Sequence, residues 1–259
     1  MNPACIGVFD SGVGGLSVLR ALRAQWPRAP LVYLADSGHA PYGERTPDYV
    51  LDRSRRILAR LRQEGAAGLV IACNTATAIA VQALRSETPD FTIIGVEPGL
   101  KPAVQATRNG RIGVMATPGT LASEKFARLV ASQAQGVTVV PRPCPGLARL
   151  IEDGDLHAPA LLAAIDQHAA ALRTAGVDTV VLGCTHYAFV HAQIQAAMGP
   201  DVQIVDTADA VARHAVRSLH GRVADSDAPA RLITTGDPER LRRIAAAWLP
   251  FACSVEALS

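Results

Sequence analysis

Two stretches of the chain, Gly65-Ala-Ala-Gly-Leu-Val-Ile-Ala-Cys73-Asn-Thr75 and Gly176-Val-Asp-Thr-Val-Val-Leu-Gly-Cys184-Thr-His186, align with each other without gaps. Each is an apolar run that ends in a cysteine followed by polar residues, and the two cysteines are 111 residues apart. The tripeptide Ile6-Gly7-Val8 recurs as Ile112-Gly113-Val114, at a spacing of 106 residues. Two matches at nearly the same spacing indicate a chain built from two related halves.

Short apolar runs alternate with segments of helical period along the whole chain, and this alternation predicts parallel sheets covered on both faces by helices. We therefore expect an α/β fold of two pseudo-symmetric, doubly wound parallel-sheet domains, with the active site in the cleft between them. The N-terminal lobe is expected to comprise residues 1–96 and 208–259, because the C-terminal segment is too short for a third domain, and the second lobe residues 97–207. The predicted strands are Ile6–Phe9, Leu31–Ala35, Leu69–Ala72, Thr92–Val96, Ile112–Met115, Val137–Val140, Thr179–Gly183, Val202–Val205 and Leu232–Thr235.

The composition narrows the class of protein. A net charge of +2 without a block of basic residues argues against a nucleic-acid partner. The N-terminus lacks a signal-peptide pattern and no apolar run approaches ~18 residues, so we expect a cytoplasmic protein that does not enter a membrane. Five cysteines without a Cys-x-x-Cys pair indicate neither a disulfide framework nor a metal site.

Polar and reactive residues follow three of the predicted strands. The first strand is followed by Asp10-Ser11-Gly12, the third by Cys73-Asn74-Thr75, and its counterpart by Cys184-Thr185-His186. Because ligands of such sheets bind beyond the carboxyl ends of the strands, each half can contribute one cysteine to a shared cleft. A base on one face of a carbon atom and an acid on the other can invert a stereocentre by proton transfer.

Burial as a small apolar side chain is the commoner role of a free cysteine, and we expect it for Cys5, Cys144 and Cys253. Cys73 and Cys184 differ because each precedes a predicted helix, whose N–H groups favour a thiolate and can hold a carboxylate. The predicted helices are Ala76–Leu84 and Tyr187–Met198.

The polar residues near the two cysteines each fit more than one structural or functional role. Asp10 can cap the next helix or partner a base, and the spacing does not choose between them. His186 follows Cys184 by two residues, so on an extended backbone both side chains point the same way. The loop Gly12-Val13-Gly14-Gly15 lacks the lysine of a P-loop, which favours a tight turn near a small anion. Glu152, taken alone, has the pattern of a surface charge.

The two lysines of the chain, Lys101 and Lys125, bear on cofactor use. Racemases that use pyridoxal phosphate need a lysine that forms a Schiff base with it. Because neither lysine lies at a predicted strand end, a mechanism without a cofactor is favoured.

Taken together, five segments resemble the glutamate racemase family, within the aspartate/glutamate racemase superfamily. They occur in the family's order, and their sequences are IGVFDSGVGGLS (6–17), YLADSGHAPYGER (33–45), IACNTAT (71–77), GVEPGLKPA (95–103) and LGCTHY (182–187). The resemblance implies cofactor-independent interconversion of L- and D-glutamate, supply of D-glutamate for peptidoglycan, a cytoplasmic location and a homodimer. Related aspartate racemases tend to have Cys-Asn-Thr-Ala-His and Gly-Cys-Thr-Glu, whereas this chain has the glutamate-type version at both cysteines.

The same resemblance implies roles for individual residues. Cys73 and Cys184 match the catalytic acid/base pair, Asp10 the carboxylate that assists the first thiol, and His186 and Glu152 the groups associated with the second. Substrate-binding positions are matched by Asp10, Ser11, Tyr42, Gly43, Asn74, Thr75, Thr185 and His186, with Thr117 and Thr120 as further candidates.

Three other functions fit parts of the pattern. A racemase of aspartate would use the same two thiols. A cysteine hydrolase would use Cys184 as nucleophile and His186 as base, and would leave Cys73 without a role. A non-catalytic amino-acid binding protein of two lobes would hold glutamate without exchanging its α-hydrogen.

Overall fold

The two aligned stretches fold as equivalent units in the computed structural model, which describes residues 4–258. Each begins at a glycine with positive φ, 89° at Gly65 and 68° at Gly176. These glycines follow the helices α2 (Pro47–Gln63) and α8 (Pro159–Thr174), where a left-handed residue ends a helix most easily when it has no side chain.

The chain forms two sheets, and every strand pair in them is parallel. The first has the strand order β10-β9-β2-β1-β3-β4 and the second β6-β5-β7-β8. The order β2-β1-β3-β4 is repeated by β6-β5-β7-β8, so the internal match of the sequence extends to topology. The strands are β1 (Cys5–Asp10), β2 (Leu31–Ala35), β3 (Ala66–Ile71), β4 (Thr92–Gly95), β5 (Arg111–Ala116), β6 (Thr138–Pro143), β7 (Thr179–Gly183), β8 (Gln203–Val205), β9 (Ala230–Thr234) and β10 (Cys253–Ala257).

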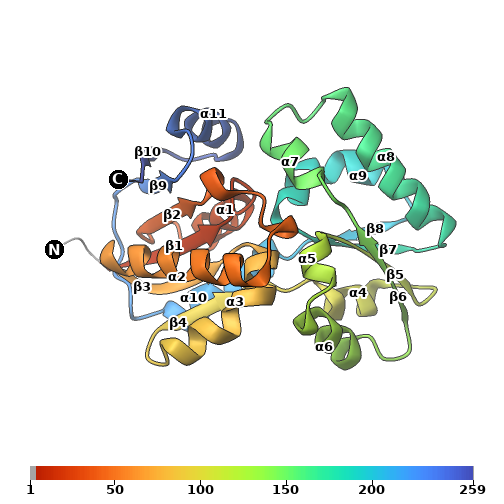
Figure 1. Cartoon of the computed structure of the whole chain (residues 1–259), viewed down its shortest axis with the longest axis horizontal. Coiled ribbons are helices and arrows are strands. Elements are labelled where there is room, and N and C mark those ends of the chain that lie inside the picture. Colours follow the sequence, from red (N-terminus) through yellow and green to blue (C-terminus); the bar gives the residue numbers. More distant parts are fainter. Residues whose placement is uncertain (1–3, 259) are drawn as a thin grey trace.

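Helices cover both faces of each sheet. Each sheet and its helices form one lobe, and the two lobes lie side by side (Figure 1). The remaining α-helices are α1 (Leu16–Gln25), α3 (Asn74–Glu87), α4 (Leu100–Ala106), α5 (Pro118–Leu121), α6 (Glu124–Gln133), α7 (Leu147–Glu152), α9 (His191–Met198), α10 (Ala208–Leu219) and α11 (Pro238–Trp248), and three 3-10 helices are η1 (Ser37–His39), η2 (Tyr42–Glu44) and η3 (Thr185–Val190). None of the helices between residues 4 and 258 is long and apolar enough to cross a membrane.

The last part of the chain returns to the first sheet. β9 pairs with β2, β10 pairs with β9, and α10 packs against α1. In Figure 1 these blue elements lie beside the red and orange ones. The exact residues at which one lobe gives way to the other stay a prediction.

Each sheet separates two apolar clusters because side chains alternate along a strand. On β1, Ile6 and Val8 face the cluster that contains α1 and α10, whereas Phe9 faces the cluster that contains α2 and α3. All of these side chains are buried. The carboxyl ends of the strands, and with them the loops that follow, thus occupy fixed positions at the junction of the lobes.

All nine predicted strands are present, although one strand and one helix differ from the prediction in their bounds. The strand predicted at 137–140 extends to Pro143, and β6 lies at the edge of its sheet, where prolines are tolerated because no further strand needs their missing N–H. The helix predicted at 187–198 begins only at His191, because residues 185–190 form η3. Residues 1–3, part of the segment in which no leader was predicted, lie outside the described residues.

Candidate active site

The carboxylate of Asp10, at the end of β1, lies where the two lobes meet. Its Oδ1 accepts a hydrogen bond from the Gly12 amide at 2.8 Å, and its Oδ2 accepts one from the Thr185 hydroxyl of the other lobe at 3.0 Å. Complete burial raises the pKa of Asp10, although the charge of His186 and these hydrogen bonds act in the opposite direction. The site therefore contains a carboxylate that ionises less easily than in water.

Cys73 caps the N-terminus of α3 and lies on the first-lobe side of the site. Its Sγ accepts a hydrogen bond from the Ala76 amide at 3.4 Å and donates one to the Ser11 hydroxyl at 3.5 Å. Burial, together with the nearby charge of Asp10, raises the pKa of Cys73 to about 12. At neutral pH this sulfur is a thiol, which can donate a proton.

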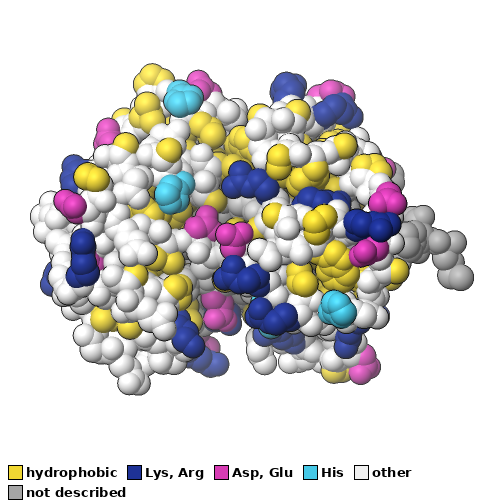
Figure 2. Space-filling view, turned by 180° about the vertical axis from the view of Figure 1, so that it is seen from behind, with side chains coloured by type: hydrophobic (Ala, Val, Ile, Leu, Met, Phe, Trp, Pro, Cys, Tyr) yellow, Lys and Arg dark blue, Asp and Glu magenta, His cyan; other side chains and the backbone are white. Residues whose placement is uncertain are grey.

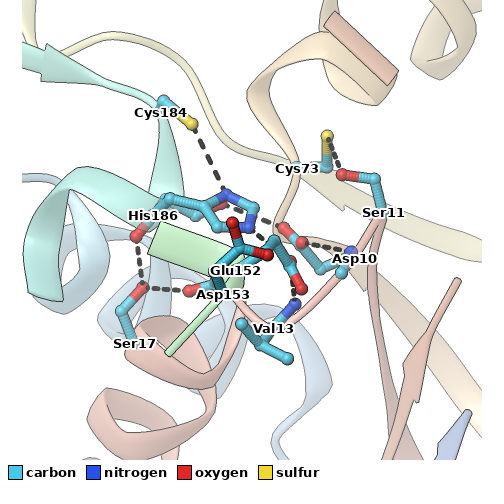
Figure 3. A network of polar contacts seen from close by, with 12 residues as sticks. Asp10, Ser11, Val13, Ser17, Cys73, Glu152, Asp153, Cys184 and His186 are labelled. Carbon is cyan, nitrogen blue, oxygen red and sulfur yellow. Dashed lines mark hydrogen bonds and ion pairs between the residues drawn. The ribbon is translucent and has the colours of Figure 1, made fainter. Parts of the chain in front are cut away.

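Cys184 begins a chain of three side chains on the second-lobe side (Figure 3). Its Sγ lies 3.6 Å from Nδ1 of His186, and Nε2 of His186 lies 2.6 Å from Oε1 of Glu152. The same Oε1 accepts a hydrogen bond from the Val13 amide of the first lobe at 2.6 Å. We refer to Cys184, His186 and Glu152 as the relay.

The relay favours a charged imidazole. Burial acts to lower the pKa of His186, but its hydrogen bonds to Cys184 and Glu152 raise it well above the usual value. Burial likewise acts to raise the pKa of Glu152, and the hydrogen bond and charge of His186 lower it instead. An imidazolium between a carboxylate and a sulfur can stabilise that sulfur as a thiolate. The two cysteines therefore have opposite surroundings.

One cavity brings the two sulfur atoms together. Cys73 and Cys184 both line it, and its volume of about 20 Å³ is close to the space that one water molecule needs. Most of the predicted substrate-binding residues line it as well: Ser11, Tyr42, Gly43, Asn74, Thr75, Thr117, Thr185 and His186. Asn74 is buried and its Oδ1 has no hydrogen-bond partner, so this oxygen can accept a hydrogen bond from a ligand.

Three threonines join the lobes beside this cavity. The Thr75 hydroxyl lies 2.9 Å from that of Thr117 and 3.3 Å from that of Thr120. A Cβ built on Gly43 would lie 2.6 Å from the Cβ of Thr117, so only glycine allows this close approach. Thr120 contacts the other two threonines but does not line the cavity.

Asp36, a buried residue that the sequence analysis did not single out, fixes the position of Tyr42. Its carboxylate accepts a short hydrogen bond from the Tyr42 hydroxyl, two from Arg53 at 2.8 and 2.9 Å, and one from Thr235 at 2.9 Å. A signal was present in the sequence, because Asp36-Ser37-Gly38 at the end of β2 repeats the Asp-Ser-Gly at the end of β1.

The structure corrects one interpretation and refines another. Glu152 is not a surface charge, because it is 9% exposed and held by Val13 and His186. Asp10, expected beside the first thiol, forms its hydrogen bond across the lobes to Thr185, next to the second, while Ser11 contacts Cys73 directly. The catalytic and binding roles of all these residues stay predictions.

A second, larger cavity of about 270 Å³ adjoins the first. Both are lined by Ala40, Pro41 and Glu152, and the larger one extends between α7 and α11. Figure 2 shows the molecule from behind, with charged side chains gathered along the groove between the lobes. Within residues 4–258, no group of three or more His, Cys, Asp or Glu residues is arranged to hold a metal ion.

Comparison with known proteins agrees with this arrangement. The model of the Asp/Glu/Hydantoin racemase family matches residues 7–215. A glutamate racemase of Pseudomonas entomophila is 48% identical over 93% of this chain and 92% of its own length, and one of Pseudomonas aeruginosa is 46% identical over 94% and 93%.

Among solved structures, a glutamate racemase of Bacillus anthracis superposes with a TM-score of 0.88 at 32% identity, covering 99% of this chain and 97% of its own. The Escherichia coli glutamate racemase, in complex with L-glutamate and an activator, gives 0.86 at 28% identity, covering 98% and 100%. The chain therefore belongs to the Asp/Glu/Hydantoin racemase family.

Proposed function

We propose that this chain interconverts L- and D-glutamate by moving the α-proton between Cys73 and Cys184, without a cofactor. The observation that carries the proposal is that two thiols from opposite lobes line one cavity, each with different polar neighbours. The curated relatives named above are glutamate racemases, and the Escherichia coli relative was solved with L-glutamate bound.

The surroundings of the two sulfurs suit opposite roles in one direction of the reaction. Cys73 carries a proton, because its pKa is raised to about 12. Cys184 faces the His186 imidazolium, a positive charge placed to stabilise a negative charge on this sulfur during the reaction. In one direction the Cys184 thiolate takes the α-proton and becomes a thiol, leaving a carbanion at the α-carbon. Cys73 then delivers its own proton to the opposite face and becomes the thiolate.

Groups around the cavity suit a substrate with two carboxylates and an ammonium. The hydroxyls of Ser11 and Thr75 can donate hydrogen bonds to carboxylate oxygens, and the unpartnered Oδ1 of Asn74 can accept one from the ammonium. The carboxylate of Asp10 does not line the cavity itself and acts on it through its hydrogen bond from Thr185. Aspartate, one methylene shorter, is the alternative substrate.

The test is incubation of the purified protein with L-glutamate in deuterium oxide, without added cofactor. Deuterium should appear at the α-carbon while the optical rotation decays, and aspartate should exchange far more slowly. Cys73→Ala and Cys184→Ala should each lower kcat for racemisation by roughly 10²–10⁴-fold, the usual contribution of a general acid or base. Absence of α-proton exchange, together with a hydrolytic activity that Cys73→Ala retains, would point instead to a hydrolase that uses Cys184 and His186.

We further propose a cytoplasmic homodimer that supplies D-glutamate for peptidoglycan, as implied by the resemblance to the glutamate racemases. Light scattering of the purified protein tests the dimer. Growth of a bacterial strain that requires D-glutamate, once it expresses this chain, tests the cellular role.

A further inference from the structure

The C-terminal helix α11 contacts the second lobe at two points, although it belongs to the first. Its residues Leu241, Ile244 and Ala245 are buried in the core of the first lobe. Arg240 and Trp248 reach across instead. Figure 1 shows α11 beside α7.

The first contact is at the end of α7. Nη2 of Arg240 donates a short hydrogen bond to the backbone carbonyl of Glu152 and lies 3.3 Å from Oδ1 of Asp153. Glu152 is the last residue of α7, whose final carbonyls lack partners within the helix. A guanidinium at this end completes the hydrogen bonding and opposes the negative end of the helix dipole. Arg240 thus holds the backbone of a residue of the relay.

The second contact is at η3. The ring of Trp248 stacks on that of Phe189, with centroids 3.6 Å apart and planes 19° apart. Phe189 lies three residues after His186 in the same 3-10 helix. Both rings pack against the apolar cores of both lobes. Trp248 thus supports the element that carries the imidazole of the relay.

We propose that α11 positions the relay, with Arg240 holding Glu152 and Trp248 holding η3, so that His186 stays between Glu152 and the Cys184 sulfur. Arg240 and Trp248 are positioning residues, because neither lines the cavity between the two thiols. The proposal extends the proposed function by adding two residues remote from the substrate.

Several charged and titratable groups surround the relay and influence the ionisation of His186 and Glu152. They come from β1, the ends of β3 and β7, the loop before α7, α7 itself, η3 and α11. These groups are Asp10, Cys73, Cys184, Cys144, Glu152, Tyr187 and Arg240. Among them, Arg240 contacts the backbone carbonyl of Glu152 and not its carboxylate. Because 41% of its side chain is accessible, Arg240 can be replaced without disturbing the apolar core. It is therefore the residue to vary.

Arg240→Gln removes the charge, Arg240→Lys keeps it, and Arg243→Gln is a matched control on an exposed position of the same helix. The side chain of Arg243 is exposed and forms no hydrogen bond or ion pair with another side chain of the described range 4–258. Two measurements are made on each variant: kcat and KM for glutamate, and the rate at which iodoacetamide alkylates Cys184 at pH 7, followed by mass spectrometry of its peptide.

We expect Arg240→Gln to lower kcat by roughly ten- to a hundredfold with little change in KM, since misplacing a catalytic group by about 1 Å can cost about a hundredfold. Alkylation of Cys184 should slow in parallel, because a displaced His186 no longer lies beside the sulfur to assist its reaction as a nucleophile. Arg240→Lys should restore part of both rates, and Arg243→Gln should match the unchanged protein. Trp248→Ala should act as Arg240→Gln does, and Trp248→Phe should retain most activity.

Equal rates in Arg240→Gln and Arg243→Gln would overturn the proposal. A lower unfolding temperature of Arg240→Gln with unchanged alkylation of Cys184 would also overturn the proposal. It would show that the contact between Arg240 and Glu152 stabilises the fold without positioning the relay. If the unchanged protein itself does not exchange the α-proton of glutamate, the proposed function fails, while the alkylation rates still decide whether α11 positions the relay.

Discussion

At the residue scale, Asp10 and Asp36 are both completely buried aspartates at strand ends, with opposite surroundings. Two neutral donors hold Asp10, and burial raises its pKa. For Asp36 the hydrogen bonds from Arg53, Tyr42 and Thr235 overcome burial and lower the pKa. The two residues should therefore affect stability in opposite senses as the pH changes.

Asp10→Asn should stabilise the fold at neutral pH. A group whose pKa is higher in the folded state contributes stability below its unfolded pKa and loses it as the pH rises through the folded value. The gain from the substitution should thus be absent below about pH 4, near the unfolded pKa of aspartate, and should grow as the pH rises above it. Typical stabilising substitutions yield about 0.5–2 kcal/mol, often at a cost in activity. Thermal unfolding between pH 3.5 and pH 8 measures it, and a lower unfolding temperature at pH 7 would contradict it.

Asp36→Asn should have the opposite effect. Because the folded pKa is lowered, ionised Asp36 contributes stability above its unfolded pKa, and this is lost as the pH falls through the folded value. At pH 7 the substitution leaves the half-buried Arg53 without its partner and should cost roughly 3–5 kcal/mol, the range found when a buried pair is broken. The same unfolding experiments, extended down to about pH 2 and with Asp10→Asn as the contrast, should show the deficit shrink below about pH 4. A constant deficit across the series would argue against a role for the charge.

At the element scale, the sequence predicts the strands of both sheets because apolar runs and their flanking turns are local features. It also predicts the ends of β1, β3 and β7 as the places of chemistry, because polar residues follow them directly. β10 escaped prediction because Cys253-Ser-Val-Glu-Ala is a half-exposed edge strand without an apolar run. The burial of Glu152 depends on contact with Val13, 139 residues away, which no local pattern contains.

The loop between β1 and α1 offers a test at this scale. A Cβ built on Gly12 would lie 1.8 Å from Oε1 of Glu152, so Gly12→Ala must displace that carboxylate and, through it, His186. We expect kcat to fall by about tenfold or more. Glu152→Ala removes the clash, so adding Gly12→Ala in that background should cost little further activity. A double-mutant cycle measures the difference, and strictly additive effects would show that Gly12 acts by another route.

At the scale of the whole molecule, the lobes are closed over the site. The cavity between the thiols has room for about one water molecule. Hydrogen bonds cross the lobe boundary from Thr185 to Asp10, from Val13 to Glu152 and between Thr75 and Thr117. An amino acid with two carboxylates cannot enter this space unless the lobes separate or the side chains move. Glutamate binding should therefore alter the contacts between the lobes.

The two tryptophans allow this motion to be measured. Trp248 stacks on Phe189 across the lobes, whereas Trp26 stacks on His220 within the first lobe. In a Trp26→Phe variant, emission therefore reports on the contact between the lobes, and saturating D- or L-glutamate should change its intensity or wavelength. In a Trp248→Phe variant, emission comes from Trp26 and should stay constant. Because both variants keep an aromatic ring at the changed position, each should retain its local packing. A Trp248 signal that does not respond to glutamate, in a variant that still exchanges the α-proton, would mean that the substrate enters through side-chain motion while the lobes stay together.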